Sequence, residues 1–148
     1  MARPILPPTY FLASLVLVGL AHAFAPLATV APWPWRLAGL LPIALGAGLN
    51  LAADGAFKAR ATTVKPFERS SALVVDGVFR FTRNPMYLGM TLILAGVATL
   101  LGSLSPLLVS LAFAALMQAR FIRVEETTLA ETFGAEWEAY AKRTRRWI

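Results

Sequence analysis

The sequence predicts an all-α polytopic membrane protein with about four transmembrane helices. Of its 148 residues, 57% are hydrophobic and only 15% are charged, whereas a soluble domain carries about 25% charged residues. Charged residues are also missing from three long stretches, which lie between Arg3 and Arg36, between Arg36 and Asp54, and between Arg83 and Arg120. These stretches are where the chain can cross a bilayer.

The first two spans are expected in the N-terminal half of the chain. The first covers about residues 10–30 and is followed by a turn rich in proline and tryptophan, which suits the aromatic belt of a membrane interface. The second covers about residues 37–53, near the lower end of the ~17 to 25 residues that a spanning helix needs. Its glycines would let a neighbouring helix approach closely; they are Gly39, Gly46 and Gly48.

The third uncharged stretch is too long for one span. It is broken by the sequence GSLSP at residues 102–106, and clusters of Gly, Ser and Pro mark turns. We therefore expect a helical hairpin with arms at about residues 85–101 and 107–122. Because the second arm is short, it is expected to cross by local thinning of the bilayer or by snorkelling of Arg120.

The basic residues determine the expected orientation. Residues 57–83 carry six of them and the segment from Arg120 onward carries six more, while the opposite turns hold only Arg36. Since cytoplasmic loops carry an excess of Lys and Arg, both termini are expected in the cytoplasm. Residues 21–23, AHA, resemble a signal-peptidase site after a short apolar stretch, so cleavage of the N-terminal segment is the alternative.

The composition also excludes several classes of function. The basic residues flank apolar runs and do not form a stripe with interleaved aromatic residues, so no nucleic-acid partner is expected. The chain has no cysteine and a single histidine, His22, so no metal site is expected either. We interpret residues 1–148 as a single integral membrane domain.

Two cytoplasmic segments are less apolar and are where function is expected. Residues 57–83 have the turn residues of a loop, and residues 123–148 have the pattern of one or two amphipathic helices. In the second segment four large side chains recur at helical spacing, a pattern more typical of packing than of a ligand site; they are Leu129, Phe133, Trp137 and Tyr140.

Residues 83–89, RNPMYLG, open the third span. Pro85 suits the first helical turn and Asn84 is a good N-cap. A capped helix start explains these two residues but not Tyr87 or Gly89. Because a helix N-terminus offers free amides to an anion, this segment is a candidate for holding the carboxylate end of a cofactor.

A pair of carboxylates, Glu125 and Glu126, directly follows the fourth span. Carboxylates at the membrane edge are costly unless they are solvated, paired or used. One of them is a candidate counter-charge for a cationic ligand, while the other pairs with an arginine. An ordinary solvated ion-pair face, with Arg120 and Arg123 nearby, is the alternative.

Four ordered blocks carry a family resemblance. They are TTVKP at residues 62–66, LVVDGVFR at residues 73–80, RNPMYLG at residues 83–89, and the pattern EExxL followed by FGxxWxxY at residues 125–140. With these blocks, residues 57–147 resemble the isoprenylcysteine carboxyl methyltransferase family. The resemblance implies a membrane methyltransferase that uses S-adenosylmethionine, with a cofactor pocket built from the loop, the start of the third span and the Glu-Glu helix.

The resemblance also implies roles for particular residues. The implied cofactor-binding residues are Ser71, Ala72, Leu73, Val74, Phe79, Asn84, Pro85, Met86, Tyr87 and Glu125. Among these, Glu125, Tyr87 and Asn84 are the expected catalytic residues. Arg120 and Arg123 are candidates for substrate binding.

Two positions depart from the family pattern. Asn84 stands where eukaryotic members have histidine, although many bacterial members also resemble this chain in having asparagine there. Phe121 stands where the eukaryotic enzymes have a substrate-contacting arginine. We therefore expect a protein of a bacterial inner (plasma) membrane whose acceptor is small or lipophilic and need not be a prenylated cysteine. The candidate acceptors are a prenyl-cysteine carboxylate, a small thiol, a lipid amine and an isoprenoid acid.

The expected reaction is an in-line displacement at the sulfonium methyl group, without a metal. Catalysis would come from positioning, desolvation and charge complementarity, and aromatic faces such as Phe79, Tyr87 and Trp137 would stabilise the sulfonium cation. Two alternatives stay open. One is an NADPH-dependent membrane reductase of the steroid or sterol reductase type, which has similar Pro-x-Tyr blocks, and the other is a membrane scaffold without enzymatic activity.

Overall fold

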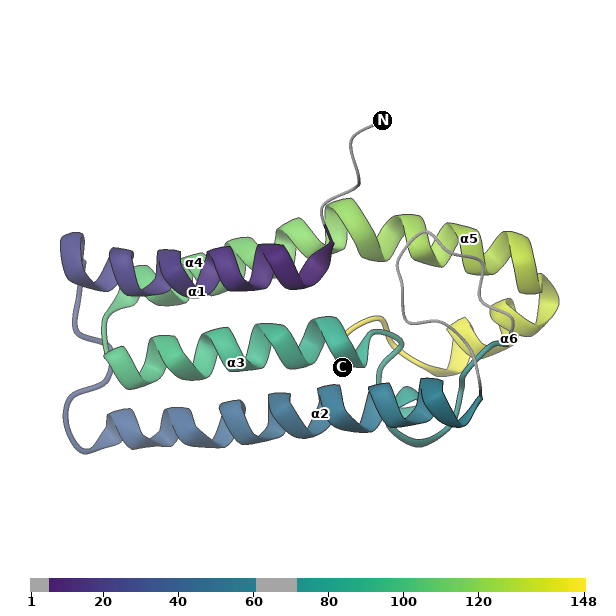
Figure 1. Ribbon diagram of the computed structural model, residues 1–148, viewed down its shortest axis with the longest axis horizontal. Coiled ribbons are helices and arrows are strands. Elements are labelled where there is room, and N and C mark those ends of the chain that lie inside the picture. Colours follow the sequence, from purple (N-terminus) through teal and green to yellow (C-terminus); the bar gives the residue numbers. More distant parts are fainter. Residues whose placement is uncertain (1–5, 61–71) are drawn as a thin grey trace.

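The computed structural model describes residues 6–60 and 72–148, and it confirms the all-α prediction (Figure 1). The helical elements are α1 (Pro7–Phe24), η1 (Trp35–Gly39), α2 (Leu40–Ala59), η2 (Gly77–Arg80), α3 (Pro85–Leu101), α4 (Leu104–Met117), the π-helical turn η3 (Gln118–Ile122), α5 (Arg123–Phe133) and α6 (Ala135–Arg143). Ser71 and the TTVKP block lie outside the described residues.

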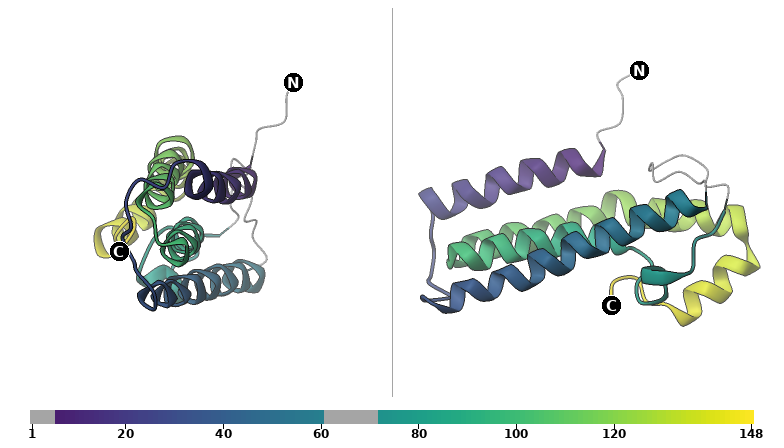
Figure 2. Two further views of the ribbon diagram at one scale, coloured as in Figure 1. Left: turned by 90° about the vertical axis from the view of Figure 1, so that its left-hand side faces the viewer. Right: turned by 60° about the horizontal axis from the view of Figure 1, so that its bottom comes forward.

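The long helices lie side by side in an elongated bundle (Figures 1 and 2). Helix α3 is central, since it packs against α1, α2 and α4. Helix α4 continues through η3 into α5, which extends beyond one end of the bundle, and α6 folds back toward the start of α3 (Figure 1). The loop with η2 lies at this same end.

Three helical stretches are long and apolar enough to cross a membrane: Pro7–Phe24, Trp35–Ala59 and Leu104–Phe133. Helix α3 is apolar but shorter, at 17 residues. Large apolar side chains on the outside of the bundle are exposed, among them Val16, Leu41 and Leu111. Since such a surface is typical of contact with lipid, the chain is an integral membrane protein.

The bounds of the first span differ from the prediction. Helix α1 starts at Pro7 and ends at Phe24, not at residue 30. Ala25 follows the end and precedes Pro26. Proline lacks an amide donor and disfavours helical geometry in the residue before it. Thr29 instead forms an isolated β-bridge with Ser103, so the chain after α1 is tied to the α3–α4 turn.

The second and fourth helices are longer than predicted because charged residues do not end them. The second runs through η1 and α2 to Ala59, and within it the Asp54 carboxylate pairs with Lys58 one turn later. The fourth starts at Leu104, because Pro106 is tolerated in a first helical turn. It continues beyond residue 122 into α5. Helix α3 has the predicted bounds.

Close packing of α2 on α3 depends on glycine. A side chain at Gly39 would collide with the Gly96 carbonyl, and one at Gly46 would collide with the Gly89 carbonyl. The two helices therefore approach with backbone against backbone. Gly48 was expected to contribute as well, but it faces open space.

Gly96→Ala is expected to lower the apparent Tm of the protein in detergent. The added methyl group would meet the Gly39 carbonyl oxygen and the Ile43 amide, which can move only if the second helix moves. Such overpacking costs about 1–3 kcal/mol, more than the roughly 0.5–1 kcal/mol that Ala gains over Gly in a helix. Gly48→Ala is the matched control and should not lower Tm. Equal Tm values for the two variants would contradict the close packing.

Candidate active site

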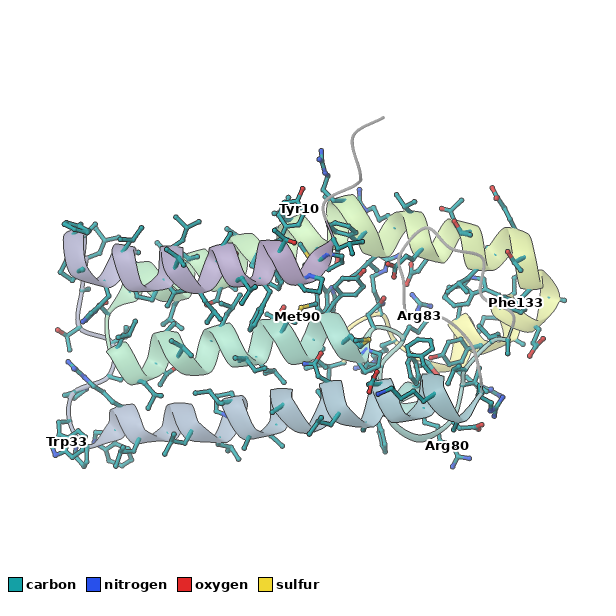
Figure 3. The ribbon with its side chains drawn as sticks, in the orientation of Figure 1. Tyr10, Trp33, Arg80, Arg83, Met90 and Phe133 are labelled. Atoms are coloured by element: carbon teal, nitrogen blue, oxygen red, sulfur yellow. The ribbon has the colours of Figure 1, made fainter. Side chains whose placement is uncertain are left out.

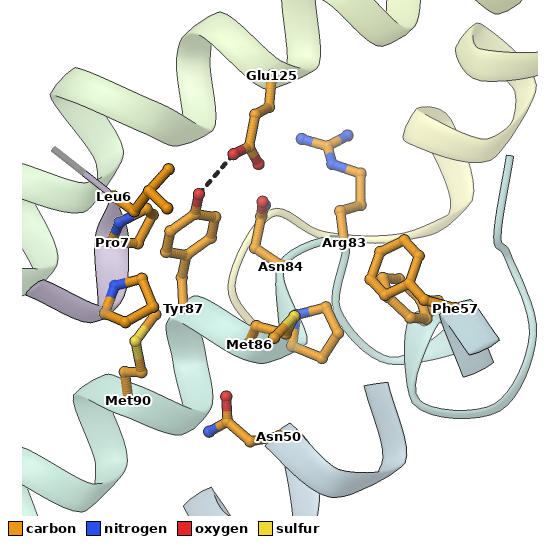
Figure 4. A pocket seen from close by; sticks show the side chains of 13 residues that line it. Leu6, Pro7, Asn50, Phe57, Arg83, Asn84, Met86, Tyr87, Met90 and Glu125 are labelled. Atoms are coloured by element: carbon orange, nitrogen blue, oxygen red, sulfur yellow. Dashed lines mark hydrogen bonds between the residues drawn. The ribbon is translucent and has the colours of Figure 1, made fainter. Parts of the chain in front are cut away.

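A pocket of about 340 Å³ lies where the start of α3 meets α5, the loop with η2 and the beginning of α1 (Figure 4). This volume falls in the range of roughly 300–1,000 Å³ that is typical of small-molecule sites. The pocket is lined by Leu6, Pro7, Pro8, Asn50, Phe57, Phe79, Arg83, Asn84, Pro85, Met86, Tyr87, Met90 and Glu125. Among these, Arg83 and Glu125 are the charged residues.

A hydrogen bond joins the two separate motifs of the sequence. The Tyr87 hydroxyl, in the first turn of α3, donates to Glu125 Oε1 of α5 at 2.5 Å (Figure 4). The Tyr87 ring also stacks on Phe121 of η3, with ring centroids 6.3 Å apart. Both contacts hold Tyr87 in one orientation at the pocket wall, and the hydrogen bond orients the Glu125 carboxylate.

Asn84 stands at the N-cap position of α3, but its side chain does not cap the helix. Its amide nitrogen instead donates to the Arg146 carbonyl at 3.0 Å. The C-terminal segment passes close to the start of α3, and this carbonyl competes for the amide. In that orientation the other side-chain atom of Asn84, Oδ1, points toward Glu125 (Figure 4). Pro85 occupies the first helical turn, as predicted.

Glu126 is neither exposed nor in the pocket. It forms an ion pair with Arg83, with 3.0 Å between Nη2 and Oε1, and only 12% of each of these two side chains is exposed. Arg146 donates to Oε2 from two nitrogens, at 2.6 and 2.9 Å. Adjacent helical residues point about 100° apart, so Glu125 faces the pocket while Glu126 faces the arginines. The solvated-face interpretation is therefore wrong for Glu126.

The Phe79 wall of the pocket is held by an aromatic pair and a hydrogen bond. The Phe79 ring meets Phe57 edge-to-face at 5.2 Å, and the Tyr140 hydroxyl donates to the Phe79 carbonyl at 2.7 Å. Burial raises the pKa of Tyr140 to about 12, against the opposing effect of Arg83 and Arg143. The hydroxyl thus remains a donor at any physiological pH.

Several expected site residues lie elsewhere. Leu73 and Val74 pack in an apolar cluster against Trp137 and Tyr140, and none of these four lines the pocket. The cause is the hydrophobic effect, because these side chains bury their apolar surface between the loop and the C-terminal helices. The packing interpretation of the C-terminal stripe is confirmed, because Leu129 and Phe133 join the same cluster. Trp137 instead lies against the Arg83 guanidinium, 5.6 Å from the ring centroid.

The two arginines expected to bind substrate are also outside the pocket. Arg120 in η3 and Arg123 at the start of α5 are exposed, and neither lines the cavity. Ala72 is partly buried and does not line it either. Among the described residues, no group of three His, Cys, Asp or Glu side chains is arranged to hold a metal ion.

The structure adds pocket residues that the motifs did not indicate. In the sequence Arg83 marks only the start of its motif. Asn50 is a lone amide in an apolar helix, and polar residues in such helices are often functional. The contribution of α1, through Leu6, Pro7 and Pro8, depends on the folded arrangement and leaves no mark in the sequence.

The arrangement of elements and the pocket agree with a comparison against protein families. The family model described as phospholipid methyltransferase matches residues 35–136, more than two thirds of the chain, from η1 to the first turn of α6. The match includes every residue that lines the pocket except those at the start of α1. No significant match was found among curated proteins. The chain therefore belongs to the phospholipid methyltransferase family of membrane methyltransferases.

Proposed function

We propose that the protein transfers a methyl group from S-adenosylmethionine to a lipophilic or small acceptor at the cytoplasmic edge of the membrane. The observation that carries this proposal is the pocket, in which Tyr87 and Glu125 meet through a hydrogen bond. The chain that forms this pocket belongs to a family of methyltransferases. A polar cofactor and a lipophilic acceptor can both reach a site in this position.

The residues that line the pocket fit the chemistry of the cofactor. Glu125 offers a carboxylate to its positively charged and hydroxyl groups. The aromatic rings of Phe57, Phe79 and Tyr87 offer faces for the sulfonium cation. Met86 and Met90 supply apolar surface that adapts to an irregular ligand.

The cofactor, when bound, supplies an electrophilic methyl group on a positively charged sulfur. The protein's own contribution is positioning and exclusion of water. Tyr87 holds the Glu125 carboxylate through its hydrogen bond, so the negative charge is oriented before a ligand arrives. Asn84 is held in the same way by the Arg146 carbonyl.

The membrane side of the pocket suits a lipophilic acceptor. Pro7 of α1, Asn50 of α2 and Met90 of α3 line this side, so the pocket lies between α1 and α2 (Figure 4). Both helices pack on α3, and the end view separates them (Figure 2). An acceptor entering from the bilayer between α1 and α2 would reach the pocket along apolar surface, with the Asn50 amide as its polar contact.

The charge distribution supports a cytoplasmic position for this end of the bundle. Among the described residues, Arg36 is the only Lys or Arg at the opposite end, where Trp33 also lies, while Arg80 and Arg83 lie at the site end (Figure 3). By the Lys and Arg bias of cytoplasmic loops, the site and both termini would face the cytosol. S-adenosylmethionine is a polar molecule and would reach the pocket from that side.

Calorimetric titration of the detergent-purified protein tests the proposed function directly. S-adenosylmethionine and S-adenosylhomocysteine are expected to bind, and NADPH is not. Binding of NADPH alone would overturn the proposal in favour of a reductase, and binding of none of the three would favour a scaffold.

The orientation can be tested by cysteine labelling, because the chain has no cysteine of its own. Ala59→Cys at the site end and Pro32→Cys at the opposite end both replace exposed residues. A membrane-impermeant thiol reagent added to intact cells should label the Pro32 variant and spare the Ala59 variant until the cells are lysed. The reverse pattern would place the site on the outer side.

Glu125→Gln is expected to weaken S-adenosylmethionine binding by about ten- to a hundred-fold, which corresponds to a charge-assisted hydrogen bond of roughly 1.5 to 3 kcal/mol. Glu131→Gln, an exposed position on the same helix, is the matched control and should bind as the wild type does. Glu126→Gln should lower Tm, because it leaves Arg83 and Arg146 without their carboxylate.

Calorimetry and thermal unfolding in parallel separate these effects. If Glu125→Gln binds normally while Glu126→Gln at a permissive temperature binds poorly, the two carboxylates have been assigned the wrong way round. If neither change affects binding, Glu125 is not part of the site.

A further inference from the structure

Arg83 is held more firmly than a surface arginine would be. Its Nη1 donates to the Ala141 carbonyl at 2.9 Å, and its Nη2 lies 3.0 Å from Glu126 Oε1. The guanidinium carbon also lies over the Trp137 ring, 5.6 Å from its centroid. Three neighbours on α5 and α6 thus hold in position a cation that lines the pocket.

One nitrogen of this guanidinium is left over. Arg83 Nε is buried and has no hydrogen-bond partner among the described residues. A buried donor without a partner is costly, and most buried polar atoms in folded proteins are paired. Since the other contacts fix the guanidinium, this donor cannot turn toward another protein group. Glu126 is shared between Arg83 and Arg146, so one carboxylate compensates two positive charges, and Arg83 is the member of this group that lines the pocket.

The charges around the pocket show what kind of ligand would match. Figure 4 shows the Arg83 guanidinium and the Glu125 carboxylate on the same side of the cavity, and no ion pair joins them among the described contacts. A cation and an anion held apart in one pocket complement a zwitterion. The amino-acid end of S-adenosylmethionine is such a group, with an ammonium and a carboxylate on one carbon.

We propose that Arg83 binds the carboxylate at the amino-acid end of the cofactor, while Glu125 takes the positively charged groups. This assignment rests on the proposed function. The neighbouring start of α3 adds the favourable end of a helix dipole for a carboxylate. Arg83 thereby becomes a specificity residue, which separates nucleosides with an amino-acid end from those without one.

Glu126 and Arg146 act as positioning residues in this arrangement. Glu126 holds Arg83 through the ion pair, and Arg146 holds Glu126 through two hydrogen bonds to Oε2. Arg146 takes one carboxylate oxygen and leaves the other for Arg83. Neither Glu126 nor Arg146 lines the pocket.

The test compares ligands that differ only at the amino-acid end. S-adenosylhomocysteine has the ammonium and the carboxylate, and 5′-methylthioadenosine lacks both. Arg83→Gln should weaken S-adenosylhomocysteine binding at least about ten-fold, as expected for loss of a hydrogen bond to a charged group. Binding of 5′-methylthioadenosine should change less than about two-fold. Arg80→Gln is the matched control, since Arg80 is exposed at 73% and lies outside the pocket.

The outcomes distinguish the assignment from the proposed function. If the wild type binds neither nucleoside, the proposed function fails and this assignment fails with it. If the wild type binds both and Arg83→Gln weakens both equally or neither, Arg83 serves the fold alone and the assignment is overturned. If Arg83→Gln does not fold, a comparison of ligands on the wild-type protein tests the assignment instead. Decarboxylated S-adenosylmethionine should bind about ten-fold more weakly than S-adenosylmethionine, and equal affinities would overturn the assignment.

Discussion

The structure at the site depends on one buried carboxylate, Glu126, held between Arg83 and Arg146. A buried charge is tolerated only when it is paired, so these three side chains must stay together. They come from α5, from the residue before the α3 N-cap and from the segment after α6. The Arg146 carbonyl also accepts hydrogen bonds from the side chains of Thr82 and Asn84. The ion-pair cluster therefore fixes the pocket walls relative to one another, although the helices that carry them are far apart in the sequence.

The continuous helix from α4 to α5 lets adjacent carboxylates serve different purposes. The π-helical turn η3 interrupts the α-helical hydrogen bonding just before Glu125, and π turns inside α-helices are frequent at functional sites. Phe121 within the turn packs against Tyr87, and Gln118 at its start accepts a hydrogen bond of 2.7 Å from Trp147. The turn thus joins the bundle core to both the pocket and the C-terminal segment, and α5 leaves it with one carboxylate toward each.

Features governed by local chemistry were predicted from the sequence, and features governed by folded contacts were not. Uncharged stretches and turn residues predict the hairpin and the bounds of α3. This is possible because apolar runs and turn-forming glycines determine local structure within a few residues of the sequence. The family resemblance also implies that Tyr87 and Glu125 belong to one site. Leu73 and Val74 do not line the pocket, and the sequence does not show that α6 folds back and buries their side chains. The role of Arg146 depends on the same fold-back and left no recognisable pattern.

Glu125 and Glu126 have different partners, and under the proposed function this difference would affect turnover. Within the described part of the chain, the polar contact of Glu125 is the Tyr87 hydroxyl and not an arginine, so a positively charged ligand would be a partner of opposite charge for it. Glu125 would attract the sulfonium form of the cofactor more strongly than the neutral thioether left after methyl transfer. The amino-acid end is the same in both. Under these proposals, anchoring by Arg83 would be common to donor and product, while Glu125 would distinguish them, so the pocket would favour release of the product over release of the methyl donor.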